Sequence, residues 1–184
     1  MKPDETPQQP VIDFLTLPET HGDGKVTRID THAATVFLSG GRALKIKRPV
    51  RFPFLDYSTL AKRKSSCEAE IEVNRPFAPA IYRGVTAITR EPGGALALNG
   101  QGEPVEYAVD MARFDERQTL DHLAEAGQID GALADRLGRA VAQAHKIAPV
   151  VDDAGFAETL VNIVEQNDGE LRAEAGLFAP DQVD

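Results

Sequence analysis

Apolar and polar residues alternate with a period of two over several short stretches in the first two thirds of the chain, a pattern typical of β-strands. Strands are predicted over residues 25–30, 35–38, 42–47, 81–89 and 105–111. The turn residues Ser39-Gly40-Gly41 join the second strand to the third as a hairpin. A glycine-rich hairpin is expected over residues 91–103.

A helical period replaces this alternation in two places. The first is residues 59–74, between the third and fourth strands, where Asp56 or Ser58 can cap the helix and Pro76 ends it. The pattern places the run Lys62-Arg63-Lys64 largely outward. The second lies after Arg113, where helices are predicted over residues 120–126, 131–147 and 156–166, with a further short one over 169–175.

This order of elements divides the chain into three parts. Residues 1–24 carry four prolines and are predicted to be a flexible N-terminal segment. Within it, the apolar residues 11–15 indicate a brief helix or turn that ends near Pro18. Residues 25–113 form a domain with a five-stranded antiparallel sheet and one helix, and residues 114–184 form a helical segment. The predicted fold class is therefore α+β.

Length and composition restrict the class of protein. The chain has 184 residues, which allows one domain or two small ones. No run reaches the roughly 18 apolar residues that cross a bilayer, so no membrane partner is expected. The proline-rich, polar start is unlike a signal peptide. Cys67 is the only cysteine, which excludes an internal disulfide and favours a cytoplasmic location.

Charge is distributed unevenly along the chain. The net charge is −9, of which −8 falls on residues 151–184, so the first 150 residues carry only −1. Eight of the 20 Lys and Arg residues lie between Arg42 and Lys64. An acidic protein is a poor candidate for nucleic-acid binding, whereas this local basic cluster suits a small polyanion such as a nucleotide.

A lysine lies within the third predicted strand, and glutamates follow on the next helix. Lys45 is flanked by apolar residues that point to the opposite face of the strand, and Glu70 borders the inward face of the helix. In kinase-like folds such a lysine neutralises phosphate oxygens of ATP and a helix carboxylate fixes its rotamer. Lys47 has the same strand parity and is the rival lysine, while Glu68 and Glu72 compete with Glu70.

Several segments, in this order and spacing, resemble the aminoglycoside phosphotransferase-like kinase family over residues 25–150. The resemblance is nearest to bacterial proteins in which such a domain often precedes a P-loop ATP-binding domain. It implies a protein-kinase-like N-lobe followed by the first helices of an incomplete C-lobe, ATP with Mg²⁺ as cofactors, and a small hydroxylated acceptor of unknown identity. The segments that carry it are Thr31–Gly40, Leu44–Val50, Phe54–Leu60, Cys67–Glu70, Asn74-Arg75, Ala78–Tyr82 and Tyr107–Phe114.

The resemblance also implies roles for individual residues. Lys45 would contact phosphate and Glu70 would pair with it. The loop before the second strand has no glycine, so hydroxyls of Thr31 or Thr35 would contact phosphate instead. The segment from Val109 to Ala112 would be the hinge that offers backbone groups to adenine, with Met111 packing against the ring.

The residues that would transfer the phosphoryl group are not found after Arg113, where the family has its catalytic and magnesium-binding loop. His21-Gly22-Asp23 matches the family's catalytic tripeptide but precedes the first strand, so no catalytic residue and no metal ligand is assigned. We therefore expect the ATP-binding part of a small-molecule kinase, inactive alone, from a fragment, a truncated product or a degenerate kinase. The alternative is a non-catalytic kinase-like binding or scaffold module.

Overall fold

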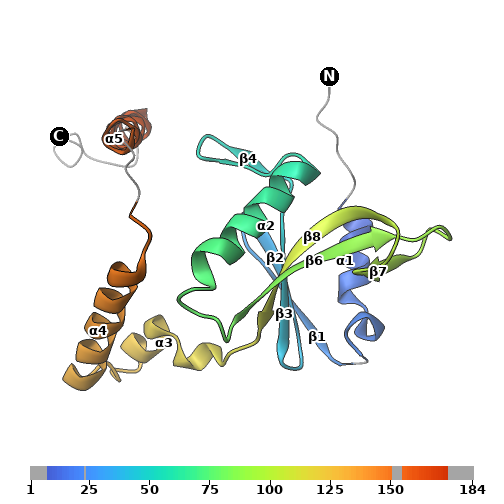
Figure 1. Ribbon diagram of the computed structural model, residues 1–184, viewed down its shortest axis with the longest axis horizontal. Coiled ribbons are helices and arrows are strands. Elements are labelled where there is room, and N and C mark those ends of the chain that lie inside the picture. The colour runs from blue at the N-terminus through green and yellow to red at the C-terminus, as the bar shows by residue number, and fades with distance from the viewer. Residues whose placement is uncertain (1–7, 23, 151–154, 174–184) are drawn as a thin grey trace. The chain divides into compact units, whose positions relative to one another are not determined.

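The computed structural model describes residues 8–22, 24–150 and 155–173, and its fold class is α+β (Figure 1). A curled antiparallel sheet has the strand order β1-β2-β3-β8-β6-β7, and β4 pairs with β5 as a separate hairpin. The strands are β1 Val26–Asp30, β2 Ala34–Ser39, β3 Arg42–Lys47, β4 Arg51–Phe52, β5 Leu55–Asp56, β6 Tyr82–Arg90, β7 Leu96–Leu98 and β8 Glu103–Ala112. The α-helices are α1 Gln9–Thr16, α2 Leu60–Asn74, α3 Leu120–Glu125, α4 Gly131–Ile147 and α5 Phe156–Ala173, with 3₁₀ turns η1 Pro18–His21 and η2 Glu116–Gln118.

The sheet has six strands where five were predicted. The additional strand is β7, which lies inside the predicted glycine-rich hairpin and pairs Leu98 with Ile88 of β6. Its apolar residues extend the hydrophobic core, which explains why the segment pairs instead of forming a loop. The hairpin β4–β5 was also not predicted, since Pro49 and Pro53 only indicated that the third strand ends.

The hairpin β2–β3 sets the register on which the site depends. Gly40 turns the chain with a φ of 52°, a conformation that suits glycine. In the resulting register Val36 lies opposite Lys45, and β8 on the other side of β3 places Val109 opposite the same lysine. Side chains alternate across a strand, so Leu44 and Ile46 point to one face of the sheet and Lys45 to the other.

The two faces of the sheet carry different helices (Figure 1). On the face of Leu44 and Ile46, α1 contributes Val11 and Leu15 to the main hydrophobic core. On the other face, α2 packs against β3, β6 and β8. The brief helix or turn predicted near the start of the chain is the helix α1. Its two buried apolar residues, spaced four apart, fix it to the sheet.

Helix α2 follows the prediction closely, except at its cap and on one face. Thr59 is the N-cap, and its hydroxyl accepts a hydrogen bond from the Lys62 amide, whereas Asp56 accepts from Ser58 instead. Arg63 was predicted to point outward and is only 2% exposed. A buried carboxylate on β8 draws it inward, as described below.

The chain divides into two compact units, residues 1–131 and 132–184. The first unit includes η2 and α3 together with the sheet. The boundary predicted after residue 113 therefore lies earlier in the chain than this division. In the second unit α5 is one continuous helix where two were predicted. Neither α4 nor α5 contains a buried residue. None of the helices in the described part of the chain combines the length and apolar character needed to cross a membrane.

Candidate nucleotide-binding site

A cavity of about 290 Å³ opens on the α2 side of the sheet, entirely within the first unit. Its wall is apolar along β2 and β3 and at the end of β8, and charged at its two ends. Small residues on β3 and β8 leave the space open, since Ala43 and Ala112 fill little of it. The lining residues are Ile29, Val36, Leu38, Ala43, Lys45, Tyr82, Met111, Ala112, Arg113, Phe114 and Glu116.

Lys45 forms one charged end of this cavity. Its ammonium pairs with Oε1 of Glu70 on α2, and its side chain keeps 24% of its surface exposed. Glu70 is 13% exposed, so the carboxylate is more enclosed than the lysine that faces the cavity. The two residues predicted to form the phosphate-binding pair are thus brought together, and one of them lines an apolar space.

Lys47 occupies the other oxygen of the same carboxylate. Its Nζ donates a hydrogen bond of 2.6 Å to Oε2 of Glu70 and lies 5.3 Å from the centre of the Tyr57 ring. Lys47 is 7% exposed and is not among the residues that line the cavity. The two lysines that the sequence left as rivals therefore share one partner and face different surroundings.

The charges of this cluster are mutually stabilised. Burial by itself raises the pKa of Glu70, but hydrogen bonds from Lys45 and Lys47 outweigh it and lower the pKa below its ordinary value. Burial by itself lowers the pKa of Lys47, but the hydrogen bond to Glu70 and the attraction of nearby negative charge, chiefly that of Glu70, together outweigh it and raise the pKa. Glu70 and Lys47 are therefore ionised near neutral pH. Two ammonium groups and one carboxylate give the cluster a formal charge of +1.

The other helix glutamates are placed elsewhere. Glu68 is exposed and pairs with Lys64 at 3.7 Å, one turn earlier on α2. The structure thus selects Glu70 as the partner of Lys45, because position 70 faces the sheet and position 68 faces outward. Cys67 is fully buried, and burial raises the pKa of its thiol to about 12.

Thr31 and Thr35 do not line the cavity. The Thr31 hydroxyl hydrogen-bonds with both the amide and the carbonyl of Ala34, at 3.0 Å each. The Thr35 hydroxyl donates to Asp30 at 2.8 Å, and the residue is 1% exposed. Both hydroxyls are thus engaged in shaping the loop between β1 and β2.

Only part of the predicted hinge, residues 109–112, lines the cavity. Val109 is fully buried and lies within β8, between β3 and β6, while Met111 and Ala112 reach the cavity wall. The cavity residues that the sequence reasoning missed include Val36, Ala43 and Tyr82. Cross-strand register could have found them, since Val36 is paired with Lys45 and both Ala43 and Tyr82 are paired with Met111.

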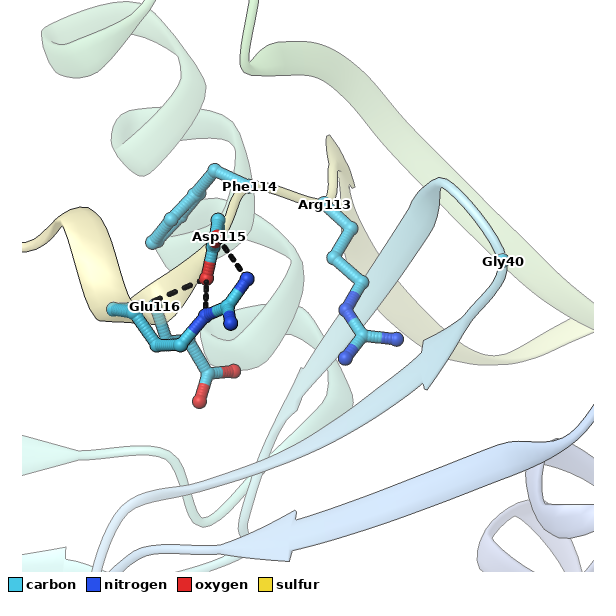
Figure 2. Close-up of a pocket in the computed structure, with 6 residues that line it drawn as sticks. Gly40, Arg113, Phe114, Asp115 and Glu116 are labelled. Atoms are coloured by element: carbon cyan, nitrogen blue, oxygen red, sulfur yellow. Dashed lines mark hydrogen bonds and ion pairs between the residues drawn. The ribbon is translucent and has the colours of Figure 1, made fainter.

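A second, more polar cavity of about 510 Å³ adjoins the end of β8 and is lined by Gly40 and residues 113–117 (Figure 2). Asp115 holds Arg117 through two hydrogen bonds of 2.9 and 2.7 Å, and the bond from Arg117 lowers the Asp115 pKa to about 2. Figure 2 shows the Arg113 side chain extending between this pair and the Gly40 turn. Arg113, Phe114 and Glu116 line both cavities.

Two further sequence features do not contribute to the site. His21 Nε2 donates a hydrogen bond to the Leu15 carbonyl at 2.8 Å. Asp23 lies outside the described residues. Across residues 8–22, 24–150 and 155–173, His, Cys, Asp and Glu side chains form no group of three or more that could hold a metal ion.

Comparison with known proteins finds relatives in mycobacteria. The chain is 33% identical over 150 residues to uncharacterized proteins of Mycobacterium tuberculosis and Mycobacterium bovis. The match covers 79% of this chain and 28% of each relative, so the chain spans well under a third of their length. No family model matches the chain. No solved structure matches it either.

Proposed function

We propose that this chain is the nucleotide-binding part of a small-molecule kinase of the aminoglycoside phosphotransferase-like type, with a kinase-like N-lobe at residues 25–113. The observation that carries the proposal is the Lys45–Glu70 pair at the charged end of an otherwise apolar cavity. A flat apolar base and a polyphosphate need such a combination, an apolar slot with a fixed cation at one end.

The dimensions of the cavity support the same ligand. The Arg113 amide donates a hydrogen bond to the Gly41 carbonyl, so Arg113 lies beside Gly41. Gly41 comes just before β3 and is four residues from Lys45. At about 3.3 Å per residue, the two ends are about 13 Å apart. That separation allows an adenine near Phe114 and phosphates near Lys45.

The base would be read by backbone after the end of β8. The backbone of Val109 is engaged in pairing with β3 and β6, and the Ala112 amide donates to Ile81. Phe114 lines the cavity, and its amide and carbonyl make no hydrogen bond to the rest of the described chain. We therefore assign the hinge contacts to Phe114, with Met111 against the ring, in place of Val109.

The chemistry proposed for this chain is limited to binding. A bound ATP would supply the phosphoryl group, and Lys45 would hold its phosphates in place. The described residues offer no cluster of carboxylates for Mg²⁺, so we assign none of them to the metal. The acceptor and the transfer step are left to residues outside this site.

The proposal is tested by calorimetric titration of the purified chain with Mg-ATP. We expect weak but saturable binding, at least tenfold weaker in Lys45→Met. The matched control is Lys64→Met, since Lys64 is an exposed lysine of α2 that pairs with Glu68, lies over the Tyr107 ring and does not line the cavity. Absence of binding by the unmodified chain at millimolar ATP, or equal loss in both variants, would contradict the proposal.

A further inference from the structure

Two lysines on one strand share one buried carboxylate. Lys45 lies at Oε1 of Glu70 and Lys47 at Oε2, and both lysines are on β3, two residues apart. A single lysine and a single glutamate would form a neutral pair. Adding the second lysine leaves one unit of positive charge that the carboxylate does not compensate.

The two lysines differ in their surroundings, and this difference determines which of them can contact a ligand in the cavity. Lys47 is enclosed, with the Tyr57 ring 5.3 Å from its Nζ, and it is not among the cavity residues. Lys45 lines the cavity and is the more exposed of the two, at 24% against 9% of the side chain. Glu70 therefore keeps the enclosed lysine as a partner on Oε2 if the exposed lysine turns from Oε1 to an incoming anion.

The nearby charges do not cancel the effect. Glu106 is a buried carboxylate that also pairs with a residue of α2, but its charge is balanced by Arg63, whose Nε lies 2.9 Å from Oε2 of Glu106. Glu116 also lines the cavity, but it lies at the end near Arg113, beyond the apolar wall. The end of the cavity at Lys45 thus carries an excess positive charge before any ligand arrives.

From this arrangement we infer that Lys47 is a positioning residue for the triphosphate: by holding Glu70, it leaves the Lys45 ammonium available to phosphate. The inference rests on the proposed function and deepens it, because it states which part of the nucleotide the cluster selects. Lys47 itself does not touch the ligand. Its removal would give Glu70 entirely to Lys45 and make the site electrically neutral.

The test separates phosphate binding from base binding. Dissociation constants are measured by calorimetry for ATP, for inorganic tripolyphosphate and for adenosine, with the unmodified chain and with Lys47→Met. We expect Lys47→Met to bind ATP and tripolyphosphate about tenfold more weakly and adenosine equally well. Lys47→Arg keeps the charge and should restore ATP affinity to within about twofold.

Two results would overturn the inference while leaving the proposed function intact. One is unchanged tripolyphosphate affinity in Lys47→Met. The other is an equal weakening of adenosine and ATP, which would mean that Lys47 only supports the fold. Failure of the proposed function looks different, because the unmodified chain would then bind neither ATP nor adenosine.

A measurement on the unmodified chain covers the case in which Lys47→Met does not fold. The ammonium resonances of ¹⁵N-labelled lysine are followed by NMR during tripolyphosphate titration, with Lys45→Arg used for assignment. We expect the Lys45 resonance to shift and the Lys47 resonance to remain in place. A Lys47 shift as large as that of Lys45 would contradict the inference.

Discussion

Helix α2 anchors two buried ion-pair clusters that differ in how open they are. Towards its N-terminus, Arg63 pairs with Glu106 of β8 at 2.9 Å, and the two side chains are 2% and 1% exposed. Two turns later, Glu70 holds Lys45 and Lys47, and Lys45 opens into a cavity. We call these the sealed cluster and the open cluster.

The sealed cluster is also the more completely hydrogen-bonded. Glu106 accepts from Arg63, from the Gln8 side chain at 2.8 Å and from the Tyr107 amide at 3.0 Å. Arg63 donates a further bond to the Tyr57 carbonyl. The sealed cluster contains one cation and one anion, whereas the open cluster contains two cations and one anion. The charges of the sealed cluster are therefore balanced within the fold, whereas the open cluster carries an excess positive charge beside a cavity.

The largest effect is expected from breaking the sealed cluster. Arg63→Met should lower the free energy of unfolding by about 3–5 kcal/mol, because it leaves the Glu106 charge buried without its cation. Denaturant unfolding followed by circular dichroism measures this change.

The control for this experiment is Lys64→Met, which removes an exposed charge next to Arg63 on the same helix and should cost no more than about 1 kcal/mol. Replacing both partners, with Arg63→Met and Glu106→Leu, should recover part of the loss, since no charge is then left buried. A cost below about 1 kcal/mol for Arg63→Met alone would mean that the two clusters do not differ in this way.

The open cluster should determine part of the acid sensitivity. The Glu70 pKa is lowered in the folded state, so its stabilising contribution is present above the ordinary value of 4.5 and is lost as the pH falls through the folded pKa. Glu70→Gln should therefore flatten the dependence of unfolding free energy on pH below about pH 5. Glu68→Gln is the matched control and should keep the slope, and equal slopes in all three proteins would argue against the assignment.

The open cluster could be predicted from the sequence only in part. Lys45 and Glu70 were identified because a lysine in an apolar strand and a glutamate on the next helix form a recognisable pair. Strand parity placed Lys47 on the same face but offered it as a competitor of Lys45. That both share one carboxylate depends on the distance between β3 and α2, which local periodicity does not contain.

The sealed cluster was not predicted for a similar reason. The run Lys62-Arg63-Lys64 looks like a solvated helix face, and only its middle residue turns inward. Its partner Glu106 is 43 residues later, on a strand whose place between β3 and β6 no local pattern reveals. Strands and helices followed from short-range pattern, whereas both charge clusters depend on contacts that are distant in sequence.

A smaller effect on stability is expected from Lys45→Met. Glu70 retains Lys47 in this variant, so the carboxylate is not left alone, and the free energy of unfolding should change by less than about 1 kcal/mol. Measured beside ATP affinity, this variant should lose binding without losing stability. A loss of 3 kcal/mol or more, as expected for the sealed cluster (about 3–5 kcal/mol), would place Lys45 among the residues that hold the fold.

The smallest effect is expected on the thiol that lies between the two clusters. Cys67 is four residues after Arg63 and three before Glu70, and burial raises its pKa to about 12. Because the thiolate is the reactive form, a thiol reagent at about pH 8 should modify the folded protein far more slowly than the unfolded one. Arg63→Met should speed labelling by loosening the sealed side, while Lys45→Met should leave the rate unchanged. Equal acceleration in both variants would show that the clusters are coupled through α2, and that opening one exposes the other.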